Sequence, residues 1–449
     1  VVELRPAVRY TRHEEDLQAD ESLYRSPGAV ADLLNYGSSA AQLLQINAHV
    51  GHERGYNGSG VTIAMFDTGY RTSHQAFAAL INDGRLLGQW DFVNNDGITD
   101  NQIGDPSSAW SHGTLTWSAA GGQVDGALYG PAYGANFLLA KTENVSSETI
   151  QEEYDWVSAL EWADSLGADV VSSSLAYSDW YQQSDFDGST AVTTLAANMA
   201  TSLGIVVCNA AANSGPGPST LNAPADAFDI LACGAVDASG FIAAFSSRGP
   251  TADGRIKPDV CARGVGTFCG GANGDTYYTT ASGTSLSTPL VAGAVAQLIQ
   301  ARPTFPPTLI MRALRETASQ NFAPNNDYGW GIINLEAALD WGVRFEALNS
   351  SADLIVVDHP ATVDFSDVSD LTGSAWSWNF GDGGSSTQQN PSHQYASPGT
   401  YSVDLTLETA YGSFDRVKPN LIVVRAGTIS VKSDSAYAGQ TLAVRVELT

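Results

Sequence analysis

The chain contains the segment Gly283-Thr284-Ser285-Leu286-Ser287-Thr288-Pro289, which leads directly into the apolar run 290–296. A tight Gly-Thr turn before an apolar run predicts a buried helix over 285–301, with Ser285 in its first turn. Backbone N–H groups at a helix N-terminus carry partial positive charge, which suits an oxyanion. The segment therefore predicts an exposed nucleophilic hydroxyl whose own N–H group points at the group it attacks.

A serine nucleophile needs a base, and the base needs a group that orients it. His112 is one of seven histidines, and the Gly-Thr pair and apolar stretch that follow it predict a helix start. Asp67 closes the apolar run 61–66 and precedes a Thr-Gly pair. We therefore expect it at the carboxyl end of a buried strand, where open α/β sheets place their chemistry. The chain order Asp67, His112, Ser285 is one of the orders in which serine triads occur.

These residues give the chain its resemblance to the subtilisin-like serine proteases, or subtilases, in which the triad has this order. A fourth match is the segment 204–213, which resembles the family's strand ending in the oxyanion-hole asparagine, here Asn213. The segments 245–250, 253–259 and 329–334 also resemble the family, and the resemblance covers residues 45–343. It implies a secreted serine endopeptidase that hydrolyses peptide bonds through an acyl-enzyme.

The resemblance implies a role for each of these residues. Ser285 attacks the scissile carbonyl, His112 takes up and returns the proton, and Asp67 holds the imidazole. Asn213 and the Ser285 N–H group bind the oxyanion. Taken singly, each motif is more often an ordinary turn or helix entry, but four of them in this order and context have no simple structural explanation. His74 lacks such a context and is expected at the surface or behind the catalytic residues.

The resemblance also implies a substrate that binds as an extended strand beside the segments 140–143 and 174–176. The walls of the S1 pocket, which receives the side chain before the scissile bond, would come from 174–176 and 210–212. Because the family usually has glycine where this chain has Ala176 and Ala212, we expect a narrower pocket that favours medium side chains. The residues assigned to substrate binding are Lys141, Thr142, Ser174, Leu175, Ala176, Ala210, Ala211, Ala212 and, near the base of the pocket, Asn222.

Apolar strands alternate with helical patterns between residues 46 and 345. Buried strands are predicted over 61–66, 137–140, 170–173, 205–211 and 230–236, and helices over 149–166, 190–203 and 285–301. Such alternation predicts an α/β domain with a parallel sheet and helices on both of its faces.

The pattern changes to short strands separated by turn signals after residue 350. The segments 376–383 and 390–395 resemble a PKD-type domain, an immunoglobulin-like β-sandwich, over 352–425. Asp382-Gly383 predicts a hairpin turn in preference to a calcium site. One interpretation of this domain is a tether to insoluble protein or polysaccharide, and its role stays open. Residues 426–449 are expected to begin a further β module.

Residues 1–45 carry many charges and no strong period, and two interpretations stay open. They are either the remnant of an inhibitory propeptide or an N-terminal arm packed on the catalytic domain. The chain starts without the charged and apolar regions of a signal peptide, so we expect any such peptide to have been removed or left out. No run of 18 apolar residues occurs, which predicts no transmembrane helix.

The chain is strongly acidic, with 48 Asp and Glu against 21 Lys and Arg and a net charge of −27. This balance argues against nucleic acid as a partner, because phosphate would be repelled. It resembles the composition of halophile proteins and also fits an ordinary acidic secreted enzyme, and both interpretations stay open.

Four cysteines are present, and none has the spacing of metal ligands. Cys261 and Cys269 flank a flexible segment and are the candidates for a disulfide, which an oxidising compartment would permit. Cys208 and Cys233 lie on predicted neighbouring strands and either pair or stay buried thiols. No cofactor is expected. Structural calcium is common in the family, and the acidic loop 94–100 is either such a site or a solvated loop.

Three other functions are compatible with the sequence. An inactive protein of this fold would act as a binding module, but the intact triad pattern argues against it. A transpeptidase would pass the acyl group to an amine in place of water. A tethering role of the β domain would add to the protease activity and would not replace it.

Overall fold

The computed structural model describes residues 34–147, 149–426, 429–432 and 445–448. Its N-terminal part, which is expected to be catalytic, is built on a seven-stranded sheet in which every pairing is parallel. The strands, in their order across the sheet, are β2 (Leu86–Asp91), β5 (Asn136–Lys141), β1 (Thr62–Asp67), β6 (Val170–Ser173), β7 (Val206–Ala210), β8 (Leu231–Val236) and β9 (Val260–Arg263). Their carboxyl ends therefore share one edge of the sheet.

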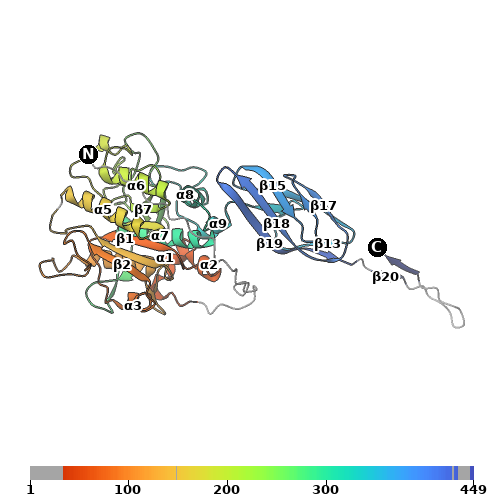
Figure 1. Ribbon diagram of the computed structural model, residues 1–449, viewed down its shortest axis with the longest axis horizontal. Helices are drawn as coiled ribbons and strands as arrows, with labels where there is room; N and C mark the ends of the chain where they lie inside the picture. The colour runs from red at the N-terminus through yellow and green to blue at the C-terminus, as the bar shows by residue number, and fades with distance from the viewer. Residues whose placement is uncertain (1–33, 148, 427–428, 433–444, 449) are drawn as a thin grey trace. The chain divides into compact units, whose positions relative to one another are not determined.

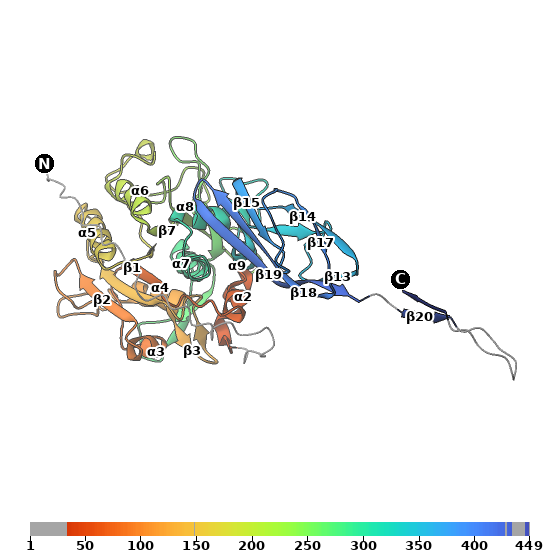
Figure 2. The same cartoon turned by 45° about the vertical axis from the view of Figure 1, so that its right-hand side comes forward.

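Four helices cover the two faces of this sheet: α4 (Ser111–Gly121), α5 (Gln151–Ser165), α6 (Val192–Leu203) and α7 (Thr284–Ala301). Ala64 and Phe66 of β1 join an apolar cluster with Trp156 of α5 and Ala197 of α6. Because side chains alternate along a strand, Met65 and Asp67 point to the other face, where α4 and α7 pack. Figures 1 and 2 show α5 beside α6, and α7 running through the middle of this part of the chain. The alternation thus decides which helices can reach Asp67.

The α/β prediction is confirmed, with strand ends within one residue and helix ends within two residues of those expected. The two edge strands β2 and β9 were not predicted. Only Asp91 of β2 is fully buried, and Gly88 and Gln89 interrupt its apolar pattern. Strand β9 has four residues and ends in the half-buried Arg263. An edge strand has a single neighbour, so its sequence need not be continuously apolar.

Shorter elements surround this framework. They are η2 (Gly37–Ser39), α1 (Ala40–Gln45), α2 (Ala48–Glu53), η3 (Gln75–Phe77), α3 (Ala78–Asn82), β3 (Gln123–Val124), β4 (Leu128–Tyr129), η4 (Gln183–Asp185), β10 (Thr267–Gly270), β11 (Tyr278–Ala281), α8 (Pro307–Glu316) and α9 (Leu335–Asp340). The hairpin β10–β11 immediately precedes α7 along the chain. It therefore leads into the segment that carries Ser285.

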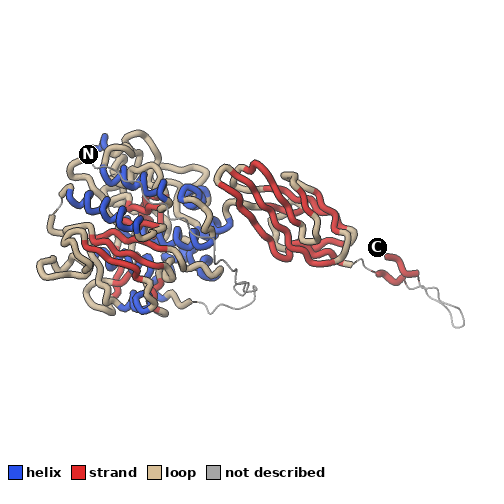
Figure 3. The backbone as a smooth tube through the Cα atoms, in the orientation of Figure 1, coloured by secondary structure: helices blue, strands red, loops and turns tan. Residues whose placement is uncertain are grey.

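The C-terminal part consists of strands and loops (Figure 3). One sheet has the order β12 (Phe345–Ala347), β14 (Ala361–Asp367), β17 (Ser392–Tyr395), and the other β13 (Ile355–Asp358), β19 (Gly412–Arg425), β18 (Gly399–Thr409), β15 (Gly373–Asn379), β16 (Ser385–Ser386). The buried Trp378 packs against Phe345, Phe365 and Phe380. The predicted β-sandwich is thus confirmed.

Asp382 lies in the hairpin turn between β15 and β16, as the sequence predicts. Its Oδ1 accepts a hydrogen bond from the Gly384 N–H group at 2.9 Å, and its Oδ2 lies 2.8 Å from His393 Nε2. The carboxylate thus stabilises the turn through bonds to the protein.

The two ends of the chain are described only in part. Residues 1–33 lie outside the described residues, whereas 37–45 form η2 and α1. The Gln42 side chain exchanges two hydrogen bonds with the Phe268 backbone, so this segment packs on the catalytic part. Near the other end, β20 (Ile429–Lys432) pairs antiparallel with β21 (Arg445–Leu448). In the described parts of the chain, no helix is long and apolar enough to cross a membrane.

The predicted disulfide between Cys261 and Cys269 is wrong, because all four cysteines are free and buried. Cys261 lies on β9 and its thiol donates to the Tyr328 carbonyl at 3.4 Å, whereas Cys269 lies on β10 and donates to the Thr267 carbonyl at 3.5 Å. Burial raises the pKa of Cys269 to about 12, as expected for an inert thiol.

Cys208 and Cys233 lie on the neighbouring strands β7 and β8, as predicted. Of the two alternatives left open for them, the structure has the buried thiols.

Candidate active site

Asp67 is the last residue of β1, and its carboxylate is almost completely buried. One oxygen, Oδ1, lies 2.7 Å from His112 Nδ1 and accepts the Thr68 N–H group at 2.7 Å. The other, Oδ2, accepts the hydroxyl of Thr116 at 2.8 Å. The backbone carbonyl of Asp67 accepts the Thr142 N–H group at 3.0 Å, which continues the pairing with β5 beyond the strand. Three residues therefore hold this carboxylate in position, and a fourth holds the backbone of Asp67.

His112 is the second residue of α4, and its imidazole is 37% exposed beside the buried Asp67 carboxylate. Burial works against the charged imidazole, but the Asp67 carboxylate outweighs it and raises the pKa of His112 above its ordinary value. Close packing at the next residue helps to fix the position of the His112 imidazole. A Cβ atom at Gly113 would lie 2.2 Å from the Gly69 carbonyl oxygen. Glycine at 113 thus lets the start of α4 approach the loop after β1.

Ser285 is the second residue of α7 and is 7% exposed. Its hydroxyl donates to the Ser174 carbonyl at 3.3 Å, and the Ser174 hydroxyl donates to the Ser285 carbonyl at 2.9 Å. Within the described residues the Ser285 hydroxyl makes no hydrogen bond to His112. A serine hydroxyl turns about one bond, and catalytic hydrogen bonds commonly tighten only when substrate binds.

Asn213 follows β7 and is exposed. Its Oδ1 accepts the Thr284 N–H group at 2.9 Å and the Thr284 hydroxyl at 3.1 Å. These bonds orient the amide and leave its Nδ2 group free of Thr284. The structure thus brings the exposed amide of Asn213 to the residue that precedes Ser285.

The residues predicted to form the S1 pocket follow β6 and β7 at the same edge of the sheet. Leu175 is held by Asn209, whose Nδ2 donates to the Leu175 carbonyl at 3.1 Å. Ala176 is exposed, whereas Ala212 is buried and has a φ of 84°. That left-handed conformation is unfavourable for a residue with a Cβ atom.

The other residues of this set lie near the same edge. Ala210 ends β7, and Ala211 follows it with its N–H group on the Cys233 carbonyl. Asn222 is half-buried and precedes Ala223, which pairs with the backbone of Tyr177 just after Ala176.

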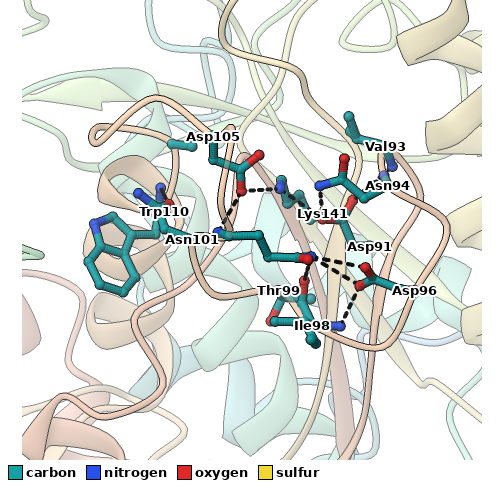
Figure 4. Close-up of polar contacts among 12 residues, drawn as sticks. Asp91, Val93, Asn94, Asp96, Ile98, Thr99, Asn101, Asp105, Trp110 and Lys141 are labelled. Atoms are coloured by element: carbon teal, nitrogen blue, oxygen red, sulfur yellow. Dashed lines mark hydrogen bonds and ion pairs between the residues drawn. The ribbon is translucent and has the colours of Figure 1, made fainter.

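The side chain of Lys141, a residue assigned to substrate binding, lies inside the protein. It is buried, and its Nζ lies 2.8 Å from Asp91 Oδ2 and 2.9 Å from Asp105 Oδ2 (Figure 4). Both carboxylates raise the pKa of Lys141 against the effect of burial. Thr142 is fully buried, and its N–H group is bound by Asp67. Both side chains therefore lie behind the edge of the sheet that carries Asp67.

The acidic loop 94–100 is tied to donors of the protein. Asp96 accepts the Ile98 N–H group at 2.8 Å and the Gln102 amide at 3.1 Å, and Asp100 accepts the Thr72 hydroxyl at 2.6 Å. Among the described residues no group of three or more His, Cys, Asp or Glu side chains is placed to hold a metal ion. The two interpretations of this loop, a calcium site and a solvated loop, therefore both stay open.

Two side chains that support the site were missed by the sequence analysis. Thr116 lies four residues after His112 on α4, so both side chains lie on the face of the helix toward Asp67. This spacing in the sequence could have indicated that Thr116 belongs to the site. Asn209 lies inside an apolar strand, where nothing in the pattern distinguishes it.

His74 is fully buried, and its Nδ1 accepts the Ala76 N–H group at the start of η3. Of the two positions expected for His74, the one at the surface is therefore wrong, and the one behind the catalytic residues stays a prediction.

The sequence of this chain is similar to those of known proteins. The subtilase family model matches residues 58–331, and a PKD domain model matches 352–424. Subtilisin E of Bacillus subtilis (strain 168) is 33% identical over 339 residues, which cover 74% of this chain and 76% of that protein. A subtilisin of Bacillus pumilus is 33% identical over 300 residues, covering 66% of this chain and 96% of that protein.

Solved structures show the same fold. A protease from Pseudoalteromonas arctica PAMC 21717 matches with a TM-score of 0.55 and 24% identity, covering 69% of this chain and 99% of that one. The MycP1 structure from Mycobacterium smegmatis matches with a TM-score of 0.54 and 22% identity, covering 70% and 87%. With the family model extending over more than half of the sequence, the chain belongs to the subtilase family of serine endopeptidases.

Proposed function

We propose that this protease cleaves protein substrates through an acyl-enzyme formed on Ser285, with His112 as the base and Asp67 as the residue that orients it. The observation that supports the proposal most directly is the 2.7 Å contact between the buried Asp67 carboxylate and His112 Nδ1. That contact keeps the proton on Nδ1, so Nε2 is left as the basic nitrogen.

The proposed reaction has two halves. Ser285 Oγ attacks the scissile carbonyl while His112 Nε2 takes its proton, and the imidazolium then protonates the leaving amine. Water then attacks the ester carbonyl while His112 takes its proton, and the imidazolium returns that proton to Ser285 Oγ as the C–Oγ bond breaks and the acid leaves. The negative charge on the carbonyl oxygen would be held by the Ser285 N–H group and by the Nδ2 group of Asn213. Such a donor typically lowers the barrier by about 2.7–4 kcal/mol, a value measured on subtilisin itself.

Replacing the nucleophile tests this assignment. Ser285→Ala removes the attacking oxygen and leaves α7 intact, so we expect loss of casein cleavage with an unchanged circular dichroism spectrum. A fluorophosphonate probe should add to the wild-type protein and leave Ser285→Ala unlabelled in intact-mass spectra. Casein cleavage by Ser285→Ala at the wild-type rate would contradict the proposal, and coupling of the acyl group to added amines in preference to water would indicate a transpeptidase.

We propose that Thr116 positions Asp67 through the bond to Oδ2. Thr116→Val removes this donor at constant shape, and a hydrogen bond to a charged group contributes about 1.5–3 kcal/mol. We expect kcat/KM to fall about tenfold. The more basic carboxylate should also raise the pKa of His112, so that the acid limb of the pH profile moves to higher pH.

Thr116→Ser, which keeps the hydroxyl, is the control and should retain most of the wild-type activity. An unchanged acid limb and rate in Thr116→Val would show that the hydroxyl has no part in holding Asp67.

We propose that the methyl groups of Ala176 and Ala212 narrow the S1 pocket, so that medium side chains are preferred over large aromatic ones. Ala176→Gly and Ala212→Gly should each raise kcat/KM for Phe relative to Leu at that position. The two variants should differ in stability. At position 212, glycine relieves the strain of the left-handed backbone conformation, which is about 1–2 kcal/mol. At position 176, glycine only gives the unfolded chain more conformational freedom, which lowers the stability of the folded protein.

Ala212→Gly should therefore melt at or above the wild-type temperature, and Ala176→Gly below it. A wild-type enzyme that strongly prefers Phe in a peptide library would contradict the narrow pocket.

We propose that the enzyme works outside the cell, in accord with its acidic surface, and that the β domain holds it on insoluble protein or polysaccharide. The charge of −27 also supports adaptation to salt, because screening would weaken repulsion among 48 acidic residues. Activity and melting temperature should then both rise from dilute buffer to molar NaCl. A flat or falling response of both would point to an ordinary acidic enzyme.

A further inference from the structure

We infer that Lys141 is a positioning residue of the active site: its ammonium group fixes the loop 92–110, and this loop in turn sets the place of His112. The inference rests on the proposed role of His112 as the base. It goes beyond that role because it assigns a task to a buried cation that does not touch the reacting atoms.

The sheet brings three charged residues together at its carboxyl edge. Lys141 ends β5 and is the register partner of Asp67 on β1 and of Asp91 on β2. Paired residues of parallel neighbouring strands project to the same face, so all three side chains lie on the side of α4. The ammonium group therefore stands beside the strand that carries Asp67 and at the root of the loop after β2.

The ammonium group joins the two ends of this loop. Asp91, fully buried, precedes the loop and accepts Lys141 Nζ at 2.8 Å, and Asp105, near its far end, accepts it at 2.9 Å (Figure 4). Asp91 Oδ1 also accepts the N–H groups of Val93 and Asn94 at 2.9 Å. These bonds fix the first turn of the loop to the same charge cluster.

From Asp105 the fixation extends to the start of α4. The Gln102 N–H group donates to Asp105 Oδ2 at 3.0 Å. Asn101 donates to the Pro106 carbonyl at 3.0 Å and accepts the Trp110 N–H group at 2.9 Å. Trp110 stands two residues before His112 and provides no side-chain cap for the helix. The loop thus holds the helix end that carries the base.

Charge explains why a cation is needed there. Residues 92–110 contain Asp96, Asp100 and Asp105 and neither lysine nor arginine. Without Lys141, the buried Asp91 and the nearby Asp105 would repel each other, and burying an unpaired carboxylate is strongly unfavourable. The loop would have to move toward water, and a shift of about 1 Å in a catalytic group costs about a hundredfold in rate.

The test compares two buried lysines. Lys141→Met removes the ammonium group at similar volume, and we expect kcat per fluorophosphonate-titrated site to fall by about ten- to a hundredfold with KM within threefold of wild type. Lys141→Arg, whose guanidinium can bind two carboxylates, should restore kcat to within about fivefold of wild type.

Lys257→Met is the matched control, because Lys257 is equally buried, lies 2.6 Å from Asp259 Oδ2 and precedes β9, an edge strand that β6, β7 and β8 separate from Asp67 on β1. It should lose thermal stability as Lys141→Met does, yet keep kcat per titrated site within threefold of wild type.

Several results would overturn the inference. They are a wild-type kcat in Lys141→Met, an equal loss in Lys257→Met, or a Lys141→Arg variant no better than Lys141→Met. If Lys141→Met does not fold, Asp105→Asn is the variant to measure. It removes the charge of the more exposed carboxylate bound to Lys141 and should lower kcat at least threefold. An unchanged kcat there overturns it too. A wild-type enzyme without activity would instead overturn the proposed function and this inference with it.

Discussion

The bond between the Asp67 carboxylate and His112 Nδ1 is the contact on which the rest of the site depends. This bond joins the end of the central strand β1 to the first turn of α4. The two groups meet only because every second side chain of β1, Asp67 among them, points toward α4. Once this contact is made, the parallel sheet brings the ends of β6 and β7 to the same edge, where α7 presents Ser285. The catalytic geometry is thus a consequence of strand direction and alternation.

The buried carboxylates near the site are bound by donors of the protein itself. Asp67 receives donors from Thr68, Thr116 and His112, and Asp91 and Asp105 share the ammonium group of Lys141. In each case the carboxylate is anchored at a strand end or in a loop and points at a donor inside the protein. Unpaired buried carboxylates would be costly, so the acidic excess is left to the solvated surface.

The sequence predicted the parallel sheet, its helices and the residues proposed as the triad, because each produces a local signal: an apolar run, a Gly-Thr turn or a strand-ending acid. It did not predict the edge strands β2 and β9, whose single neighbours relax the apolar pattern. It did not predict the ion pairs of Lys141, which the resemblance had assigned to substrate binding, because Asp105 lies 36 residues away along the chain. The Cys261–Cys269 disulfide was wrong because spacing along the chain does not reveal that the two thiols lie on different sheets.

The most direct test of the account is a crystal structure of the enzyme after reaction with a fluorophosphonate. We expect phosphorus bonded to Ser285 Oγ, with the phosphoryl oxygen within hydrogen-bond distance of the Ser285 N–H group and Asn213 Nδ2. The contact between His112 and Asp67 should be retained. An adduct on another residue, or a phosphoryl oxygen that faces neither donor, would contradict it.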